Sequence, residues 1–157
     1  MIHIICGENN QGKTKKIKSI YNNKKEGDGF IAQKIFKDSI FCGYELIRLS
    51  TEESVTQAMV ENLFPEKETP VYKQGNFLFF KESFVFADSI IEEIISNKTN
   101  PVFIDEIGPL ELRKKGYHKS LKKIFKEDRT IYITVRNKLV FDIIDFYSIK
   151  DYSLIKV

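Results

Sequence analysis

Eight consecutive residues near the N-terminus have the types and spacing of a phosphate-binding loop. The segment Gly7-Glu8-Asn9-Asn10-Gln11-Gly12-Lys13-Thr14 fits the pattern G-x-x-x-x-G-K-[ST] at every position. In such a loop, backbone N–H groups and the positive end of the following helix dipole point at the β- and γ-phosphates of a nucleoside triphosphate. The Lys13 ammonium would add charge there, and the Thr14 hydroxyl would complete the shell of a magnesium ion. We therefore predict that Gly7 to Lys15 bind a nucleotide.

Two adjacent carboxylates supply the second half of a nucleotide site. Asp105 and Glu106 follow Val102-Phe103-Ile104, which reads as a buried strand. Ligands of open α/β sheets bind at the carboxyl ends of the strands, so the pair should lie near the loop. We predict that Thr14 and Asp105 hold the metal ion. We also predict that Glu106 polarises a water for attack on the γ-phosphorus. The alternative is that the acids form a helix N-cap or a solvated turn.

Arginine is rare in this chain, with 4 residues against 21 lysines, so each position is informative. Arg136 ends a predicted strand and could stabilise charge that develops on the γ-phosphate, although it could also pair with a surface acid. The predicted catalytic set is therefore Lys13, Glu106 and Arg136. Arg113 and Glu111 follow the acid pair and could border the pocket. His3 and His118 have neither metal-ligand nor nucleophile spacing, and we assign them no chemistry.

The elements that must position these residues alternate between strand and helix at both ends of the chain. Strands are expected at 1–6, 30–36, 40–49, 54–60, 77–80, 102–105, 130–135 and 152–157. Helices are expected at 15–23, 83–96 and 138–147, with a further one marked by Tyr117, Leu121, Ile124 and Phe125. Residues 62–74 contain Pro65 and Pro70 and read as a loop. This order predicts an α/β fold with a mainly parallel sheet, helices on both faces and a β-hairpin insert, in one domain over 1–157.

The composition bounds the class of protein. At 157 residues, with 42% apolar and 30% charged residues, the chain can bury a core as a soluble globular protein. No apolar run is long enough to span a membrane, and the first residues lack the layout of a secretory signal. Cys6 and Cys42 suggest neither a disulfide scaffold nor a metal site, so we expect a cytoplasmic location. The net charge of +3 reflects lysine-rich solvated faces; nucleic acid is an unlikely partner but is not excluded, and the oligomeric state stays open.

These motifs, in this order, resemble the small P-loop nucleoside-triphosphatase family first described from thermophiles, which has a human cancer-related member. The resemblance covers nearly the whole chain. It rests on the loop Gly7–Thr14, on Gly43-Tyr44-Glu45-Leu46, on Gly75-Asn76-Phe77 and, most specifically, on Asp105-Glu106-Ile107-Gly108-Pro109-Leu110-Glu111-Leu112. It implies a RecA-like P-loop fold and slow, Mg²⁺-dependent hydrolysis of nucleoside triphosphates to diphosphates, with broad base tolerance. The loop interior Glu8–Gln11 is more polar than is usual in the family, and Lys15 stands where a second Thr is common.

Three other functions share parts of this pattern. Asp105-Glu106-Ile107-Gly108 also fits the D-x-x-G element of GTP-dependent switches, but Asn137-Lys138-Leu139-Val140 lacks the aspartate of the N-K-x-D element that guanine recognition needs. A small nucleotide or nucleoside kinase needs an arginine-rich lid, for which four arginines are too few. A nucleotide-binding adaptor with negligible turnover does not need Glu106. The sequence therefore favours a hydrolase.

Overall fold

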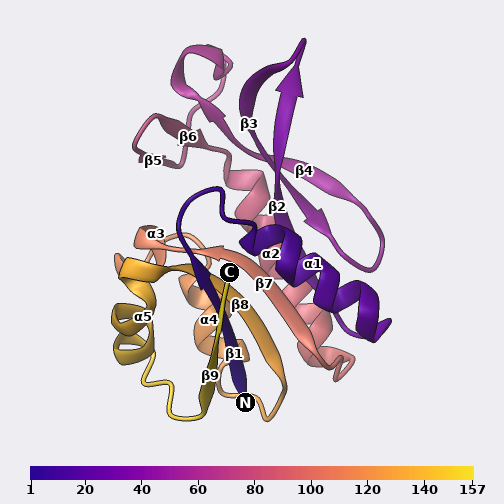
Figure 1. The fold of residues 1–157 in the computed structure, drawn as a ribbon. Coiled ribbons are helices and arrows are strands. Elements are labelled where there is room, and N and C mark those ends of the chain that lie inside the picture. Colours follow the sequence, from indigo (N-terminus) through magenta and orange to yellow (C-terminus); the bar gives the residue numbers. More distant parts are fainter.

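The computed structural model describes residues 1–157, which form a nine-stranded sheet with helices packed on it (Figure 1). The elements in chain order are β1 (Ile2–Gly7), α1 (Lys13–Lys24), β2 (Asp28–Lys37), β3 (Ile40–Arg48), β4 (Ser54–Val60), η1 (Glu61–Leu63), β5 (Tyr72–Gln74), β6 (Phe77–Phe79), α2 (Lys81–Ser96), β7 (Val102–Ile107), α3 (Pro109–Leu112), α4 (His118–Ile124), β8 (Ile131–Arg136), η2 (Asn137–Leu139), α5 (Val140–Phe146) and β9 (Tyr152–Lys156).

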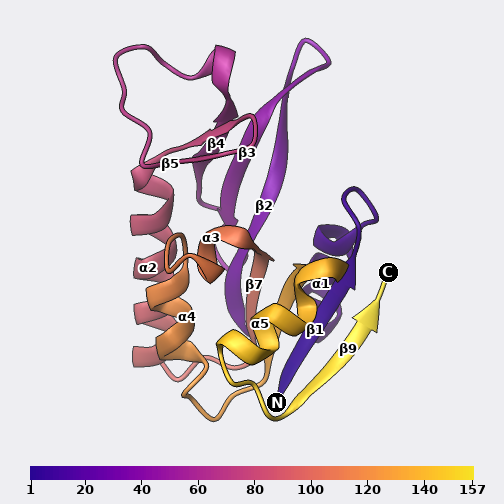
Figure 2. The same ribbon diagram turned by 90° about the vertical axis from the view of Figure 1, so that its left-hand side faces the viewer.

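The sheet has two halves, which differ in the direction of their strands. Its order is β5-β6-β4-β3-β2-β7-β8-β1-β9. The neighbours from β2 to β9 in this order are parallel, whereas those from β5 to β2 are antiparallel. The far ends of β2 and β3 project beyond the helices (Figure 2). An α/β fold with a hairpin insert is therefore confirmed, and the sheet is mostly but not wholly parallel.

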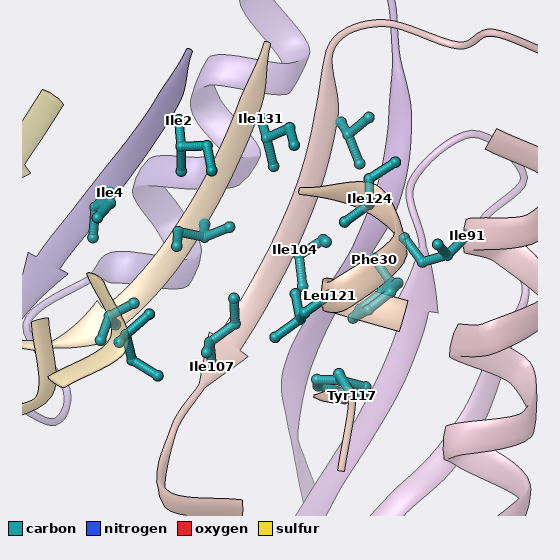
Figure 3. Packing of buried hydrophobic residues seen from close by; sticks show 14 of the residues in the cluster. Ile2, Ile4, Phe30, Ile91, Ile104, Ile107, Tyr117, Leu121, Ile124 and Ile131 are labelled. Atoms are coloured by element: carbon teal, nitrogen blue, oxygen red, sulfur yellow. The ribbon is translucent and has the colours of Figure 1, made fainter. Parts of the chain in front are cut away.

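Two hydrophobic clusters place helices on both faces of the sheet. The larger cluster joins apolar residues of β1, β7 and β8 to residues of α2, α4 and α5, including Ile91, Leu121 and Ile124 (Figure 3). The smaller cluster lies on the other face and contains Ile17 of α1. Along β1, Ile4 points to the first cluster and Ile5 to the second, as the two-residue period of a strand requires. Burial of both faces explains why the central strands are nearly continuous apolar runs.

Several element boundaries differ from the sequence-based expectation. Helix α3 was not expected, because four residues are too few to show a helical period. The expected loop over 62–74 contains η1 and the short strand β5, which pairs only with β6. The expected helix over 138–147 begins as a 3-10 turn and becomes α5 at Val140. Strand β7 does not end at the acids but runs through them to Ile107. None of the helices combines the length and the apolar character that a bilayer crossing requires.

Candidate active site

The loop between β1 and α1 is shaped by two residues with positive φ. Asn10 has φ 64°, and Gly12, the N-cap of α1, has φ 91°. A Cβ at Gly12 would meet no atom within 4 Å, so glycine is favoured there by the backbone conformation and not by lack of space. Helix α1 then begins at Lys13, two residues earlier than expected. The first turn of α1 therefore contains both Lys13 and Thr14.

Hydrogen bonds within the loop occupy some of the groups that a phosphate would contact. Lys13 is a buried residue, and its ammonium donates to the Glu8 carbonyl oxygen at 2.8 Å. The Glu8 N–H donates to Gln11 Oε1 at 2.6 Å. The Glu8 residue itself is exposed. From the insert, Lys34 Nζ donates to Asn10 Oδ1 at 2.6 Å and ties strand β2 to the loop.

The carboxylate of Asp105 lies at the junction of four elements. Its Oδ2 accepts hydrogen bonds from Thr14 Oγ1 at 2.7 Å and from the Ala32 N–H at 3.1 Å, and its Oδ1 accepts one from Thr134 Oγ1 at 2.5 Å. The side chain is completely buried. Burial and the neighbouring Glu106 raise the pKa of Asp105 to about 6, and the hydrogen bonds from Thr134 and Thr14 oppose this rise. One carboxylate thus connects α1, β2 and β8 to β7.

Glu106 has a backbone conformation that is uncommon for a residue other than glycine. Its φ is 62°, and the register between β7 and β8 shifts between Ile104 and Ile107. A bulge of this kind re-aims a side chain, and the left-handed conformation costs on the order of 1–3 kcal/mol. The Glu106 N–H donates to Thr134 Oγ1 at 2.8 Å, so a side-chain oxygen of β8 takes the place of a backbone carbonyl. The bulge turns Glu106 into a cavity beside the loop.

Thr134 is the residue that the sequence reasoning missed. Its hydroxyl donates to Asp105 and accepts from the Glu106 N–H, so one buried oxygen orients both acids. The available signal is a single aliphatic hydroxyl in the run Ile131-Tyr132-Ile133-Thr134-Val135, which is otherwise aliphatic and aromatic. Buried polar groups need hydrogen-bond partners, and the run itself offers none. This threonine therefore had to bond to another element.

A cavity of about 690 Å³ brings most of the predicted residues together. Asn9, Asn10 and Gly12 to Lys15 line one side, and Glu106 and Arg136 line it as well. Asp105 lies below the surface and reaches the cavity through its bond to Thr14. Gly7, Glu8 and Gln11 do not line it. The volume is within the usual range for small-molecule sites.

Of the other four titratable residues that the sequence analysis considered, one borders the cavity and three lie outside it. Glu111 lines the cavity but is buried, and it accepts hydrogen bonds from the Gly108 N–H at 2.8 Å and the Tyr117 N–H at 2.9 Å. Burial raises the pKa of Glu111 to about 7. Arg113 is exposed, donates to Gln74 Oε1 at 2.8 Å and does not line the cavity. His3 and His118 contact Ser153 and Tyr147 outside it.

Thr14 Oγ1 and Asp105 Oδ2 are oxygen ligands of the kind that hard metal cations bind. Both are hard donors, and no group of three or more His, Cys, Asp or Glu side chains could hold an ion by protein ligands alone. Magnesium typically takes one or two protein oxygens and completes its shell with water and phosphate. The donor set therefore suits a hard divalent cation that is bound together with a nucleotide.

A glycine loop that joins a parallel strand to a helix, with a carboxylate pair on the next strand but one, defines a P-loop nucleotide-binding fold. Comparison with known proteins makes the class more specific. The sequence model of the family described as NTPase matches residues 3–157, and the chain belongs to this family.

Its relatives and structural neighbours agree with this assignment. The nucleoside-triphosphatase THEP1 of Natranaerobius thermophilus is 30% identical over 139 residues, which are 86% of this chain and 75% of the relative. THEP1 of Pyrococcus abyssi is 29% identical over 147 residues, with coverages of 89% and 76%. The crystal structure of THEP1 from Aquifex aeolicus superposes with a TM-score of 0.76 at 21% identity, over 99% of this chain and 89% of that one. A human cancer-related nucleoside triphosphatase gives 0.69 at 19% identity, over 98% and 87%. These structures confirm the P-loop NTPase fold.

Proposed function

We propose that residues 1–157 act as one domain that hydrolyses nucleoside 5′-triphosphates, ATP and GTP among them, to diphosphates and phosphate with Mg²⁺. The observation that carries this proposal is the 2.7 Å hydrogen bond between Thr14 and Asp105, 91 positions apart in the sequence. It joins the phosphate loop to the acid pair at the carboxyl ends of the parallel strands. The family and the printed names of the relatives support the same reaction.

In this proposal the loop and Lys13 bind the phosphates. Lys13 Nζ exchanges its bond to the Glu8 carbonyl for phosphate oxygens, and the backbone N–H groups at the start of α1 point at the same anion. Thr14 and Asp105 would hold Mg²⁺, which supplies positive charge to the β- and γ-phosphate oxygens. Arg136 at the cavity wall would contact the charge that develops on the γ-phosphate.

Glu106 is the proposed general base. A water attacks the γ-phosphorus and its proton passes to the Glu106 carboxylate, while the bond from the γ-phosphorus to the bridging oxygen breaks and the diphosphate leaves. The positive φ of Glu106 supports this role, because strained backbone in the left-handed region clusters at functional sites. General-base assistance typically contributes about 10²- to 10⁴-fold to the rate.

Release of phosphate from Mg²⁺–ATP, with no acceptor molecule present, tests the proposal. The parent chain should release phosphate, and Glu106→Gln should bind ATP as the parent does but lose roughly 100-fold or more in kcat. Glu26→Gln, at an exposed acid, is the matched control and should leave kcat unchanged. Equal turnover in Glu106→Gln and the parent would contradict the assignment of the base.

Broad base tolerance needs a separate comparison. Titration with ATP, GTP, CTP and UTP should give kcat/KM values that differ by much less than about 100-fold, because the loop contacts the phosphates and not the base. A 100-fold preference for GTP would favour a GTP-dependent switch instead. Phosphate released only when an acceptor is added would favour a kinase.

A further inference from the structure

The cavity extends beyond the phosphate loop and the acids into a part whose walls come from the antiparallel insert and α2. We call this part the aromatic lobe and define it by Tyr44, Gln57, Phe77, Phe79 and Phe84. We propose that the aromatic lobe is a nucleobase-binding site. The proposal deepens the nucleotide function above and rests on it for the position of the phosphates.

The aromatic side chains of the lobe are half-buried and are packed at angles to one another. The Tyr44 and Phe77 rings lie 5.5 Å apart at 58°, and Phe84 lies 5.4 Å from Tyr117 at 54°. Rings that serve only as core are usually buried completely, as Phe30 and Phe103 are here. A half-buried ring in a concave wall leaves part of its surface for a planar ligand. All nucleobases can stack on such rings, since every base has a π-face.

Gln57 adds a polar group at the bottom of the lobe. Its side chain is 5% exposed and lines the cavity. The amide nitrogen donates to the Tyr117 hydroxyl, and the amide oxygen accepts no hydrogen bond from the protein. This oxygen is not among the fully enclosed side-chain atoms that lack a partner, so it is open to water or to a donor group of a ligand in the lobe. Few placed polar groups in an apolar wall are typical of small-molecule sites.

The lobe lies directly beside the phosphate site. Tyr44 lines the same cavity as Glu106 and Arg136. Burial and the Glu106 carboxylate raise the pKa of the Tyr44 hydroxyl, and Arg136 lowers it. Lys34 connects the two parts, because it donates to Asn10 of the loop and lies 5.8 Å from the Phe41 ring. Phe41 in turn packs on Phe77. A base held in the lobe is therefore within reach of the loop that holds the phosphates.

The base has two possible sources with the same chemistry. It can belong to the bound nucleoside triphosphate, or to a second nucleoside that faces the terminal phosphate. Stacking accounts for broad base tolerance in the first case, because it does not read the hydrogen-bonding edge. In the second case the lobe would control what approaches the γ-phosphate.

Calorimetric titration with reaction products distinguishes the two sources without requiring turnover. For Phe77→Ala and the parent, Kd is measured for ADP and for inorganic pyrophosphate, which has no base, both with Mg²⁺. If the lobe holds the nucleotide's own base, Phe77→Ala should weaken ADP at least fivefold and leave pyrophosphate unchanged. Phe77→Tyr, which keeps the ring, should bind ADP like the parent. Phe141→Ala, at an exposed phenylalanine of α5 outside the cavity, is the matched control.

The second source is tested by adding adenosine to the protein saturated with Mg²⁺–ADP. Adenosine should then bind the parent but not Phe77→Ala. If Phe77→Ala does not fold, as judged by its thermal unfolding transition, Tyr44→Ala replaces it. The proposal is overturned if ADP binds parent and variant equally and adenosine either binds neither or binds both alike. Failure of the parent to hydrolyse ATP would count against the proposed function but would leave these binding results interpretable.

Discussion

The two halves of the sheet handle their polar and aromatic side chains differently. In the parallel half, Asp105 is completely buried and receives three hydrogen bonds, from Thr14, Ala32 and Thr134. In the antiparallel half, Phe77 and Tyr44 are half-buried and contact mainly other rings. The hydrogen bonds of the parallel half fix the positions of single atoms. The rings of the antiparallel half offer apolar contact surface, which does not depend on the direction of a hydrogen bond.

This difference matches two separate requirements of the function proposed above. Attack on the γ-phosphorus needs groups held within fractions of an ångström, which hydrogen-bonded residues on central strands provide. Tolerance of different bases needs contacts that do not read an edge, which stacking provides. Substitutions in the parallel half should therefore change kcat, metal dependence and phosphate binding, and substitutions in the insert should change only the affinity for the base.

The largest effect after Glu106→Gln is expected for Lys13→Ala. Removing the ammonium should weaken Mg²⁺–ATP binding on the order of 100-fold, because hydrogen bonds to charged groups contribute most. Equilibrium titration with ATP measures this loss. Lys18→Ala, at an exposed lysine on the same helix, should bind normally. Equal affinity in Lys13→Ala and the parent would place the phosphates elsewhere.

Thr134→Val tests whether one hydroxyl orients both acids. Valine keeps the shape but removes the bonds to Asp105 and to the Glu106 N–H. Substitutions behind a metal ligand typically cost about 10- to 100-fold in metal affinity or activity. The Mg²⁺ concentration for half-maximal rate should rise by roughly 10-fold or more, and Thr134→Ser should restore it. A fall in thermal stability with no change in the Mg²⁺ requirement would reduce Thr134 to a packing residue.

Arg136→Ala should lower kcat by about tenfold or less, since an electrostatic contact at the cavity wall adds to Lys13 and the metal without replacing them. Initial-rate measurements at saturating ATP give this value. Arg113→Ala is the control, because that side chain is exposed and does not line the cavity. An unchanged kcat in Arg136→Ala would show that Arg136 only lines the cavity.

The last prediction concerns stability against pH rather than activity, and it tests a carboxylate that borders the site without a proposed catalytic role. Burial raises the pKa of Glu111 from 4.5 to about 7, so the folded state binds its proton more tightly than the unfolded chain does. Its contribution to stability is complete below the unfolded pKa and is lost as the pH rises through the folded pKa, on the order of 3 kcal/mol.

Glu111→Gln should therefore flatten the decline of the unfolding free energy between about pH 5 and 7. Part of the decline should remain, because burial raises the pKa of Asp105 as well. Urea unfolding at a series of pH values measures the slope, with Glu26→Gln as the control. An unchanged slope in Glu111→Gln would show that its carboxyl does not titrate in this range.

The sequence predicted what contiguous motifs encode. The loop from Gly7 to Thr14 and the pair Asp105-Glu106 are short segments whose residue types state their own chemistry, and the apolar runs beside them predicted β1, β7 and β8. The proximity of loop and acids followed from the rule that ligands bind at the carboxyl ends of parallel strands.

Contacts between distant residues were beyond the reach of sequence reasoning. Thr134 bonds to residues 28 and 29 positions away, and only the strand order places it between the loop and the acids. The positive φ of Glu106 arises from a bulge, and the sequence has no glycine at this position that would indicate it. Strand β6 was expected at 77–80, but the three residues of β5 are too few for a periodic pattern, and the cavity wall that these two strands help to form appeared only with the fold.

The most direct test of the central claim is a crystal structure of Glu106→Gln with Mg²⁺ and a non-hydrolysable ATP analogue. It should show the metal on Thr14 Oγ1 beside Asp105, the γ-phosphate on Lys13 Nζ, and the residue 106 side chain facing a water opposite the leaving oxygen. A triphosphate bound away from Lys13, or a metal that touches neither Thr14 nor the water shell around Asp105, would contradict the account.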